Sequence, residues 1–366
     1  MSQRFAFVLV SSLFLAACGP AEPLKLGFIG GLSGQVADLG NAGRNGFQMA
    51  IEQANATGSV PGRKIEFVLK DDAQSAAQAR QAAEELVAAG VVAIVGPMTS
   101  SMVPPILEVA TKAKIPLVSP TATSSMLTGK DDNFLRVISD TRSYAEQSAN
   151  YHAKNGVRSV AAVFDTRNRT YTESWLADFR QAFAAQGGAM AVEVAFESGE
   201  NADYGGLVKT LAASRADAFL FIANAIDTAR LAQHAREQDV QRALIGVEWA
   251  GTEQLIEFGG KAVDGMVLSQ FFDREDRSPE YQLFRQSYEK RFNSPPGFAS
   301  IAAYDATKAV LDALARGGVR EELKSALISR GPYAGAQQAV VFDRFGDSQR
   351  RTFTTVIRDG RFVVVN

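Results

Sequence analysis

The stretch from Val91 to Thr123 constrains the fold more than any other part of this sequence. A β-branched run, Val91–Val95, ends at Gly96-Pro97. After an apolar helical stretch, a second short run, Ile115–Val118, ends at Ser119-Pro120. This is the order strand, loop, helix, strand, loop, and it predicts a βαβ unit whose two strands are parallel neighbours in one sheet.

Hydroxyl side chains follow both of these strands. Ser100 and Ser101 come after the first, and Thr121 and Thr123 come after the second. Both loops leave the carboxyl ends of adjacent strands, where open α/β sheets bind ligands. The first loop also opens a helix, whose free N–H groups and positive end favour a carboxylate or a phosphate. The alternative is that Ser100 only caps its helix.

Strand and helix patterns alternate on both sides of this unit. The alternation restarts near residue 142 without a flexible linker, and the chain ends in three strand-like runs, Ala339–Phe342, Thr352–Ile357 and Arg361–Val365. Asp359-Gly360 is a hairpin turn signal between the last two. Because 366 residues are too many for one small core, we predict an α/β protein with two lobes.

The N-terminus predicts export and attachment to a lipid. Arg4 precedes an apolar run, Phe5–Phe14, which has the length of a signal peptide and is too short to span a membrane. The run leads into Leu15-Ala16-Ala17-Cys18, which matches the bacterial lipobox. Cys18 is the only cysteine, so it forms neither an internal disulfide nor a multi-cysteine metal site. We predict a signal peptide over residues 1–17, lipidation of Cys18 and a linker over residues 18–23, which together tether the chain to a membrane.

Composition and motifs argue against several other classes. The net charge is −2 and no basic stripe is present, so nucleic acid is not an expected partner. The glycine-rich segment Gly30–Gly34 has neither dinucleotide-binding spacing nor a phosphate-loop lysine, and no cofactor is predicted. His152 and His234 are the only histidines, and we interpret both as surface residues of helices. Without a metal-binding spacing or a nucleophile elbow, the chain is not expected to be an enzyme.

A series of short motifs extends over nearly the whole chain that would remain after cleavage. They are Ile29–Gly34, Gly62–Glu66, Lys70–Ala73, Ile94–Pro97 with Ser100-Ser101, Ile115–Thr123, Gly246–Glu248 and Tyr304–Ala306. In this order and spacing they resemble the periplasmic substrate-binding proteins of ABC importers, type I fold, in the branched-chain amino-acid (Leu/Ile/Val) branch. The resemblance implies two Rossmann-like lobes joined by three crossovers, with the ligand in the cleft between them. The expected lobes are residues 24–141 plus 271–345 and residues 142–270 plus 346–366.

The resemblance also implies a set of ligand-binding residues. Ser100, assisted by the backbone N–H of Ser101, is expected to bind an α-carboxylate. Thr121 and Thr123 are expected to bind the α-ammonium from the same lobe, and Glu248 from the other lobe. The chemistry of the residues agrees, because a zwitterion needs donors at one end and acceptors at the other.

Other positions leave the side-chain specificity open. Tyr171 is expected to lie over the ligand, and Asn224 falls near a further contact position. Trp249 either walls the side-chain pocket or packs elsewhere. Leu39 stands near a position where the family often has an aromatic residue. The two arginines of Asp165–Arg169 either serve a second carboxylate or lie on the surface.

The sequence thus predicts a solute-binding lipoprotein in the periplasm or at the cell surface. It would bind a small amino acid, branched-chain or related, and deliver it to an ABC permease. One alternative is the same fold with a carboxylate or amide ligand that is not an amino acid. Another is a regulatory or sensory lipoprotein without a transport role, which the retention of Ser100, Thr123 and Glu248 makes less favoured.

Overall fold

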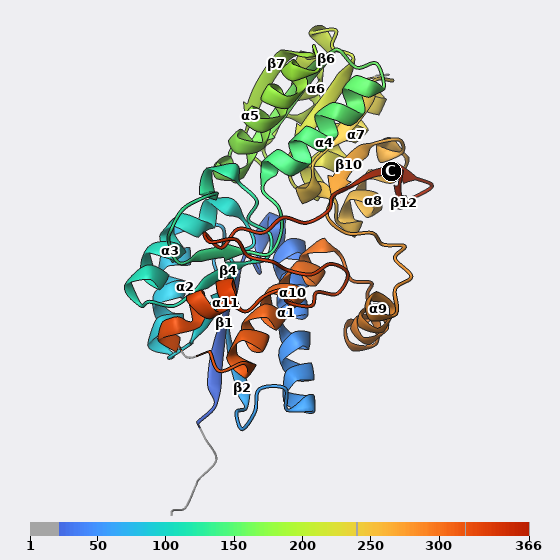
Figure 1. The fold of residues 1–366 in the computed structure, drawn as a ribbon. Coiled ribbons are helices and arrows are strands. Elements are labelled where there is room, and N and C mark those ends of the chain that lie inside the picture. The colour runs from blue at the N-terminus through green and yellow to red at the C-terminus, as the bar shows by residue number, and fades with distance from the viewer. Residues whose placement is uncertain (1–21, 239–240, 319, 366) are drawn as a thin grey trace, which may run out of the picture.

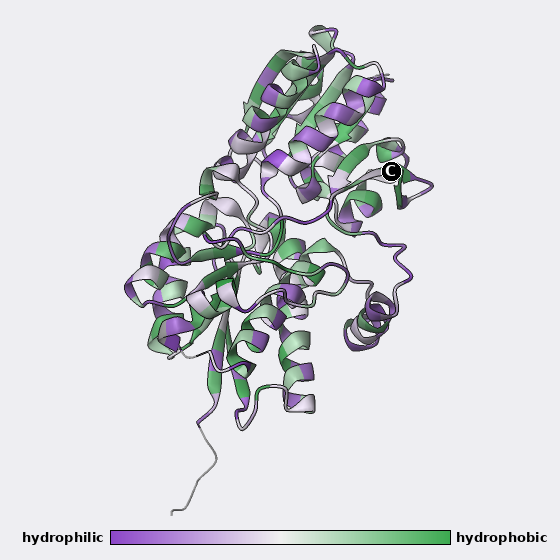
Figure 2. Ribbon diagram, viewed as in Figure 1, coloured by the Kyte–Doolittle hydropathy of each residue, from purple (hydrophilic) through white to green (hydrophobic). Residues whose placement is uncertain are grey.

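The computed structural model describes residues 22–238, 241–318 and 320–365. The predicted signal peptide and the predicted lipidation site, Cys18, lie outside these residues. The described chain forms two α/β lobes, each built on its own sheet with helices on its faces (Figure 1). Apolar residues are concentrated on the strands inside each lobe, and polar residues on the outer helix faces (Figure 2). No helix among these residues is both long and apolar enough to cross a membrane.

The first lobe contains a five-stranded sheet in which all strands are parallel. In spatial order the sheet is β2-β1-β3-β4-β5. The strands are β1 (Leu24–Gly30), β2 (Ile65–Asp71), β3 (Ala93–Val95), β4 (Leu117–Ser119) and β5 (Phe134–Arg136). β3 and β4 pair in parallel, with Ile94 opposite Leu117 and Val95 opposite Val118. The predicted βαβ unit is therefore confirmed.

Helices from two distant parts of the sequence belong to this lobe. They are α1 (Ala37–Thr57), α2 (Ala76–Ala88), α3 (Val103–Lys112), α9 (Pro279–Phe292), α10 (Phe298–Ala315) and α11 (Leu323–Ser329). α1 and α10 lie side by side (Figure 1). Their approach requires Gly46, because a Cβ at this position would lie 2.0 Å from the Ser300 carbonyl oxygen.

The second lobe contains a seven-stranded mixed sheet in the order β12-β11-β10-β9-β8-β6-β7. The strands are β6 (Ser159–Asp165), β7 (Ala189–Phe196), β8 (Ala218–Ile222), β9 (Ala243–Gly246), β10 (Val267–Gln270), β11 (Phe353–Arg358) and β12 (Arg361–Val364). The helices are α4 (Thr141–Lys154), α5 (Arg169–Ala185), α6 (Tyr204–Ala213), α7 (Ala225–Glu237) and α8 (Glu253–Gly259). β11 and β12 form the predicted antiparallel hairpin, and Asp359 and Gly360 have φ of 49° and 68° as such a tight turn requires.

Six short 3-10 helices complete the described structure. They are η1 (Gly34–Val36), η2 (Ser100–Met102), η3 (Ser125–Leu127), η4 (Glu248–Ala250), η5 (Gly260–Val263) and η6 (Arg320–Glu322). η2, η3 and η4 follow β3, β4 and β9 directly or within a few residues. They therefore place polar side chains at the carboxyl edges of both sheets.

One predicted strand, Ala339–Phe342, is wrong. Its residues make only isolated bridges, between Tyr333 and Val340 and between Phe342 and Ser348. The apolar run is buried at alternate positions as a strand would be, but none of its residues pairs with a strand of either sheet. The same connection reaches the edge strand β5 only further along, where the Arg136 N–H donates to the Gly346 carbonyl at 3.0 Å. Without an adjacent strand to supply ladder hydrogen bonds, the run cannot form a strand.

The chain passes between the two sheets three times, as Figure 1 shows. The passages follow β5, follow β10 and precede β11. The carboxyl edges of the parallel strands in both lobes therefore face each other across the region where the three passages lie. The exact lobe boundaries at residues 141/142, 270/271 and 345/346 remain a prediction.

Candidate functional site

Two adjacent loops of the first lobe form one side of the site. After β3, Gly96 has φ of 122°, and a Cβ here would lie 2.0 Å from the Ile29 carbonyl oxygen, so the turn requires glycine. The loop after β4 is joined to this turn by side-chain hydrogen bonds. The Ser119 hydroxyl donates to the Pro97 carbonyl at 2.7 Å, and the Thr121 hydroxyl donates to the Met98 carbonyl at 2.6 Å. These bonds fix the positions of the hydroxyl side chains that follow.

A cavity lies between these loops and the second lobe. It combines polar groups with a largely apolar wall. Its lining residues are Leu39, Met98, Ser100, Thr121, Thr123, Ile138, Asn168, Tyr171, Glu248, Trp249, Gln270, Phe271 and Phe298. Five of the seven predicted ligand-binding residues are in this set. A small ligand at this position would contact both lobes at once.

The donor side of the cavity centres on Ser100. Its side chain is buried, and its hydroxyl oxygen accepts the Ser124 backbone N–H at 3.2 Å. The hydroxyl proton is therefore not needed for that bond and can be donated to a ligand oxygen.

The acceptor side combines Thr121, Thr123 and Glu248. Thr121 uses its hydroxyl proton on the Met98 carbonyl, which leaves its oxygen lone pairs as the remaining hydrogen-bonding capacity. The Thr123 hydroxyl donates to Glu248 Oε1 across the lobes at 3.3 Å. This side of the cavity therefore offers acceptors and one carboxyl group, as an ammonium group requires.

Glu248 has an unusual electrostatic environment. Trp175 of α5 donates its indole N–H to Glu248 Oε2 at 3.0 Å, and the Tyr171 hydroxyl is buried against the same carboxyl. Burial raises the pKa of Glu248 to about 7, against the lowering effect of these hydrogen bonds. A cation beside this carboxyl would offset the cost of burial by favouring its charged form.

Two of the predicted ligand contacts, Ser101 and Asn224, do not line the cavity. The Ser101 N–H donates to Asn168 Oδ1 at 3.1 Å, and the Ser101 hydroxyl oxygen accepts the Thr170 N–H at 3.2 Å, so both groups serve contacts between the lobes. Asn224 caps α7, where its Oδ1 accepts the Asp227 N–H at 3.0 Å and its Nδ2 donates to the Asp227 carboxylate at 2.7 Å. The structure gives both residues another role.

Further polar contacts hold the lobes together around the cavity. The Ser124 hydroxyl donates to the Thr170 carbonyl at 2.7 Å. The Thr252 hydroxyl donates to the Asp38 carboxylate at 2.9 Å, and the Ser198 hydroxyl donates to Gln35. These contacts, like those of Ser101, join the strand-end loops of one lobe to those of the other. The described conformation is therefore a closed one.

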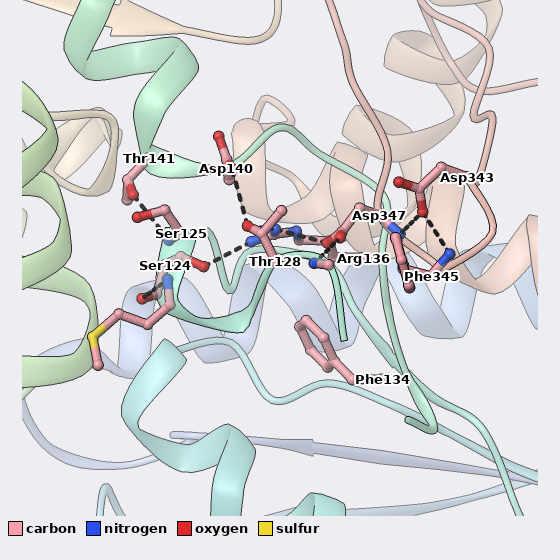
Figure 3. A network of polar contacts seen from close by, with 12 residues as sticks. Ser124, Ser125, Thr128, Phe134, Arg136, Asp140, Thr141, Asp343, Phe345 and Asp347 are labelled. Atoms are coloured by element: carbon pink, nitrogen blue, oxygen red, sulfur yellow. Dashed lines mark hydrogen bonds and ion pairs between the residues drawn. The ribbon is translucent and has the colours of Figure 1, made fainter. Parts of the chain in front are cut away.

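A buried arginine ties the acceptor loop to one of the three passages (Figure 3). Arg136, at the end of β5, donates to the Ser124 carbonyl at 2.9 Å and to the Thr128 hydroxyl. It also pairs with Asp347, in the passage before β11, at 2.7 Å. Asp347 in turn accepts the Gly129 N–H at 2.8 Å. The loop that carries Thr121 and Thr123 is thereby attached to the passage that leads into β11.

The rest of the cavity wall is mostly apolar. Trp249 lines it and packs edge-on against Tyr171, with ring centroids 5.5 Å apart. Leu39 lines the wall as well. Arg167 and Arg169 do not, because their side chains are half exposed or more and pair with Glu197 and Glu173. The residues that line the cavity therefore include no cationic group for a side-chain carboxylate.

Several residues that line the cavity, and one that only bonds to Glu248 behind it, Trp175, were not predicted. Trp175 could have been found from its position, since it lies four residues after Tyr171 on the same helix face. Phe271, Phe298 and Gln270 lie far from the motifs in sequence and give no comparable signal. Asn168 stands in a polar loop that had no specific assignment.

The two histidines give no catalytic arrangement. His152 is buried on α4 and burial lowers its pKa to about 4, so the interpretation as a surface residue is wrong for it. It faces the protein interior because its position falls on the buried face of α4. His234 is partly exposed and lies 2.9 Å from Glu237. Among the described residues, no group of three or more His, Cys, Asp or Glu side chains is arranged to hold a metal ion.

Comparison with known proteins gives a consistent result. A model of the periplasmic binding protein family matches residues 23–366. A Leu/Ile/Val-binding protein of Rhizobium johnstonii is 26% identical over 318 residues, which are 87% of this chain and 85% of that protein. The leucine-binding protein LivK of Thermotoga maritima matches with a TM-score of 0.87 and 24% identity, over 94% of this chain and 98% of that one. A solute-binding protein of R. palustris in complex with benzoate matches with a TM-score of 0.85 and 18% identity, over 94% and 95%.

These relatives are substrate-binding proteins and not enzymes, and the two-lobed α/β architecture is the type I fold that they share. Their family model covers all but the first 22 residues of the sequence. The chain therefore belongs to the periplasmic binding protein family, as an extracytoplasmic solute-binding protein similar to its Leu/Ile/Val-binding members.

Proposed function

We propose that this protein binds a small α-amino acid with an apolar side chain, branched-chain or related, in the cavity between its lobes. The observation that carries the proposal is the distribution of polar groups on the cavity wall. Ser100 offers a donor, while Thr121, Thr123 and Glu248 offer acceptors with one carboxyl group. A zwitterion matches this arrangement at both ends, and charge-assisted hydrogen bonds of this kind contribute about 1.5–3 kcal/mol each.

The apolar wall supports the side-chain part of the proposal. Met98, Ile138, Phe271 and Phe298 line the cavity together with Leu39. A branched aliphatic side chain would be removed from water against these residues, at about 25 cal/mol per Å² of apolar surface. A charged side chain would find no counter-charge there besides Glu248.

In the cell, we propose that the protein delivers this ligand to the permease of an ABC importer. The names of the Leu/Ile/Val-binding relatives support the ligand class. The lipobox at Cys18 supports a lipid anchor that keeps the protein at a membrane surface while it exchanges ligand with the permease.

A thermal-shift screen of the mature chain against amino acids and small carboxylates tests the ligand class. A ligand at 100 times its dissociation constant stabilises the folded protein by about 2.7 kcal/mol. Leucine, isoleucine or valine is expected to raise the midpoint of unfolding, while glutamate and lysine are not. Stabilisation by simple carboxylates alone would contradict the amino-acid proposal.

One observation favours a second ligand class. Tyr171, Trp249, Phe271 and Phe298 are all aromatic and line the same cavity, which suits an aromatic carboxylate. Because the pKa of Glu248 is about 7, its side chain is neutral in most protein molecules at slightly acidic pH. In the neutral form it would tolerate a ligand without an amine. Benzoate in the same screen distinguishes the two classes.

A further inference from the structure

Asn168 lies between the two lobes, and no motif in the surrounding sequence indicates this position. It is the N-cap residue of α5, only 3% exposed, and lines the cavity together with Ser100. The loop that carries it docks against both hydroxyl loops of the first lobe, through Thr170 on Ser101 and Ser124. Asn168 is therefore brought to the donor side of the cavity only when the lobes are together.

The orientation of the Asn168 amide follows from one hydrogen bond. Its Oδ1 accepts the Ser101 backbone N–H at 3.1 Å. Because a backbone N–H can only donate, the atom facing it is the oxygen, and the nitrogen occupies the other position. That nitrogen carries two N–H donors and makes no hydrogen bond to another described residue. A donor on a buried side chain needs an acceptor.

The acceptors of the cavity, Thr121, Thr123 and Glu248, do not bond to Asn168 in the structure. A carboxylate in the cavity would also find few other donors. The Ser100 hydroxyl is itself a donor toward the cavity, and no lysine, arginine or histidine lines the wall. A carboxylate accepts up to four hydrogen bonds, so Ser100 alone would leave most of its capacity unused.

We propose that Asn168 Nδ2 donates a hydrogen bond to the carboxylate of the bound ligand, opposite Ser100. Each charged end of the ligand then joins the two lobes. The carboxylate lies between Ser100 and Asn168, and the ammonium lies between Thr121 with Thr123 and Glu248. The inference rests on the proposed function for the carboxylate of the ligand, and it is independent of the amine.

This arrangement makes Asn168 a determinant of specificity. A primary amide in place of the carboxylate would bring N–H groups toward Asn168 Nδ2 and would lose part of the interaction. The ratio of the affinity for an amino acid to the affinity for its amide is therefore expected to be larger than a contact with Ser100 alone would give.

The variant Asn168→Asp tests the inference with little change of shape. It keeps an acceptor for the Ser101 N–H, and aspartate is a favourable N-cap with a favourable charge at the start of α5. It replaces the donor with a carboxylate oxygen, so at about pH 8 two like charges would meet in the cavity. We expect the affinity for leucine to fall at least about 100-fold, and the affinity for leucinamide to stay unchanged or rise.

Calorimetry on the mature chain, with leucine and leucinamide as probes, gives these affinities. Ser101→Ala is the matched control, because it removes the bond from the Thr170 N–H and leaves the Asn168 side chain intact. It is expected to weaken leucine and leucinamide equally, and less than about tenfold. Far-UV circular dichroism and the unfolding midpoint check that both variants fold.

Two outcomes would overturn the inference. One is an Asn168→Asp variant that binds leucine within about threefold of the wild type. The other is an equal loss for leucine and leucinamide, which would assign to Asn168 only the contact with Ser101. If the wild type binds benzoate and no amino acid, the proposed function fails. Benzoate and benzamide then replace leucine and leucinamide as probes. If Asn168→Asp prefers benzoate to benzamide by the same factor as the wild type does, the inference is overturned independently of the proposed function.

Discussion

The pKa of Glu248 predicts how ligand affinity depends on pH. Burial raises this pKa to about 7 from the ordinary 4.5. An ammonium group in contact with the carboxyl favours its charged form, so ligand binding is expected to lower the pKa to 4.5 or below. Because the bound complex needs the ionised carboxylate, protons compete with the ligand, and the affinity falls as the pH is lowered through 7. The titratable groups that face this carboxyl, the hydroxyls of Tyr144 and Tyr171, stay neutral over this range because burial raises their pKa values.

The size of the effect follows from the two pKa values. If the pKa is about 7 in the free protein and ligand binding returns it to its ordinary range near 4.5, the dissociation constant at about pH 5 is roughly 70 times that at about pH 8, by proton linkage. The carboxylate and ammonium of a free amino acid keep their charges over this range. At about pH 6, binding should release close to one proton.

Calorimetry in buffers of different ionisation enthalpy measures both the affinity and the released proton. Glu248→Gln is the matched control, because it keeps the shape and removes the titration. Asp72 and Asp165 have pKa values raised to about 6 by burial and remain in this variant, so the difference between the two profiles isolates Glu248. A wild-type affinity that is flat between about pH 5 and pH 8, or a profile that Glu248→Gln shares, would refute the reasoning.

Three further predictions follow from the same contacts. Ser100→Ala should weaken any carboxylate ligand about 10- to 100-fold without changing the slope of affinity against pH, as calorimetry would show, and unchanged affinity would exclude Ser100 as a donor. Trp175→Phe removes the indole donor from Glu248, so the midpoint of the pH profile should move upward; Phe183→Leu, in the same aromatic stack on α5, should leave it in place, and a shift in both would mean a packing effect. Cys18→Ala should yield a protein that carries no lipid and stays in solution without detergent. A wild-type protein whose mass spectrum shows no acyl chains would contradict the predicted lipid anchor.

The sequence was sufficient to predict one side of the site. Ser100, Thr121 and Thr123 follow two neighbouring parallel strands, and the carboxyl ends of such strands always meet at one sheet edge. The opposing Glu248 came from the family resemblance, since a glutamate after a short strand has no distinctive local pattern. The structure brings these residues to a single cavity.

The allocation of hydrogen bonds could not be predicted in the same way. The Ser101 N–H was expected to face the ligand, but it donates to Asn168 of the other lobe. Which partner a loop N–H finds depends on the docking of two lobes, and no local periodicity encodes that. Asn224 is a comparable case, because an asparagine after a strand is as suited to capping a helix as to binding a ligand.

The apolar wall of the cavity could not be predicted from the sequence for a different reason. Phe271 and Phe298 are aromatic residues at the end of a strand and the start of a helix, and such residues are usually part of a core. They reach Leu39 only because the chain returns to the first lobe after β10. The run Ala339–Phe342 shows the converse, since it has the composition of a strand but no neighbouring strand to pair with.

The most direct test of the account compares, by calorimetry on the wild-type chain near neutral pH, three ligands that share the isobutyl side chain and differ in their charged groups. They are leucine, isocaproate, which lacks the amine, and isoamylamine, which lacks the carboxylate. If both charged ends are held between the lobes, leucine should bind at least about 100-fold more tightly than either analogue, because each analogue loses one set of charge-assisted hydrogen bonds. Isocaproate binding as tightly as leucine would contradict the account, since Glu248 would then have no ammonium to pair with.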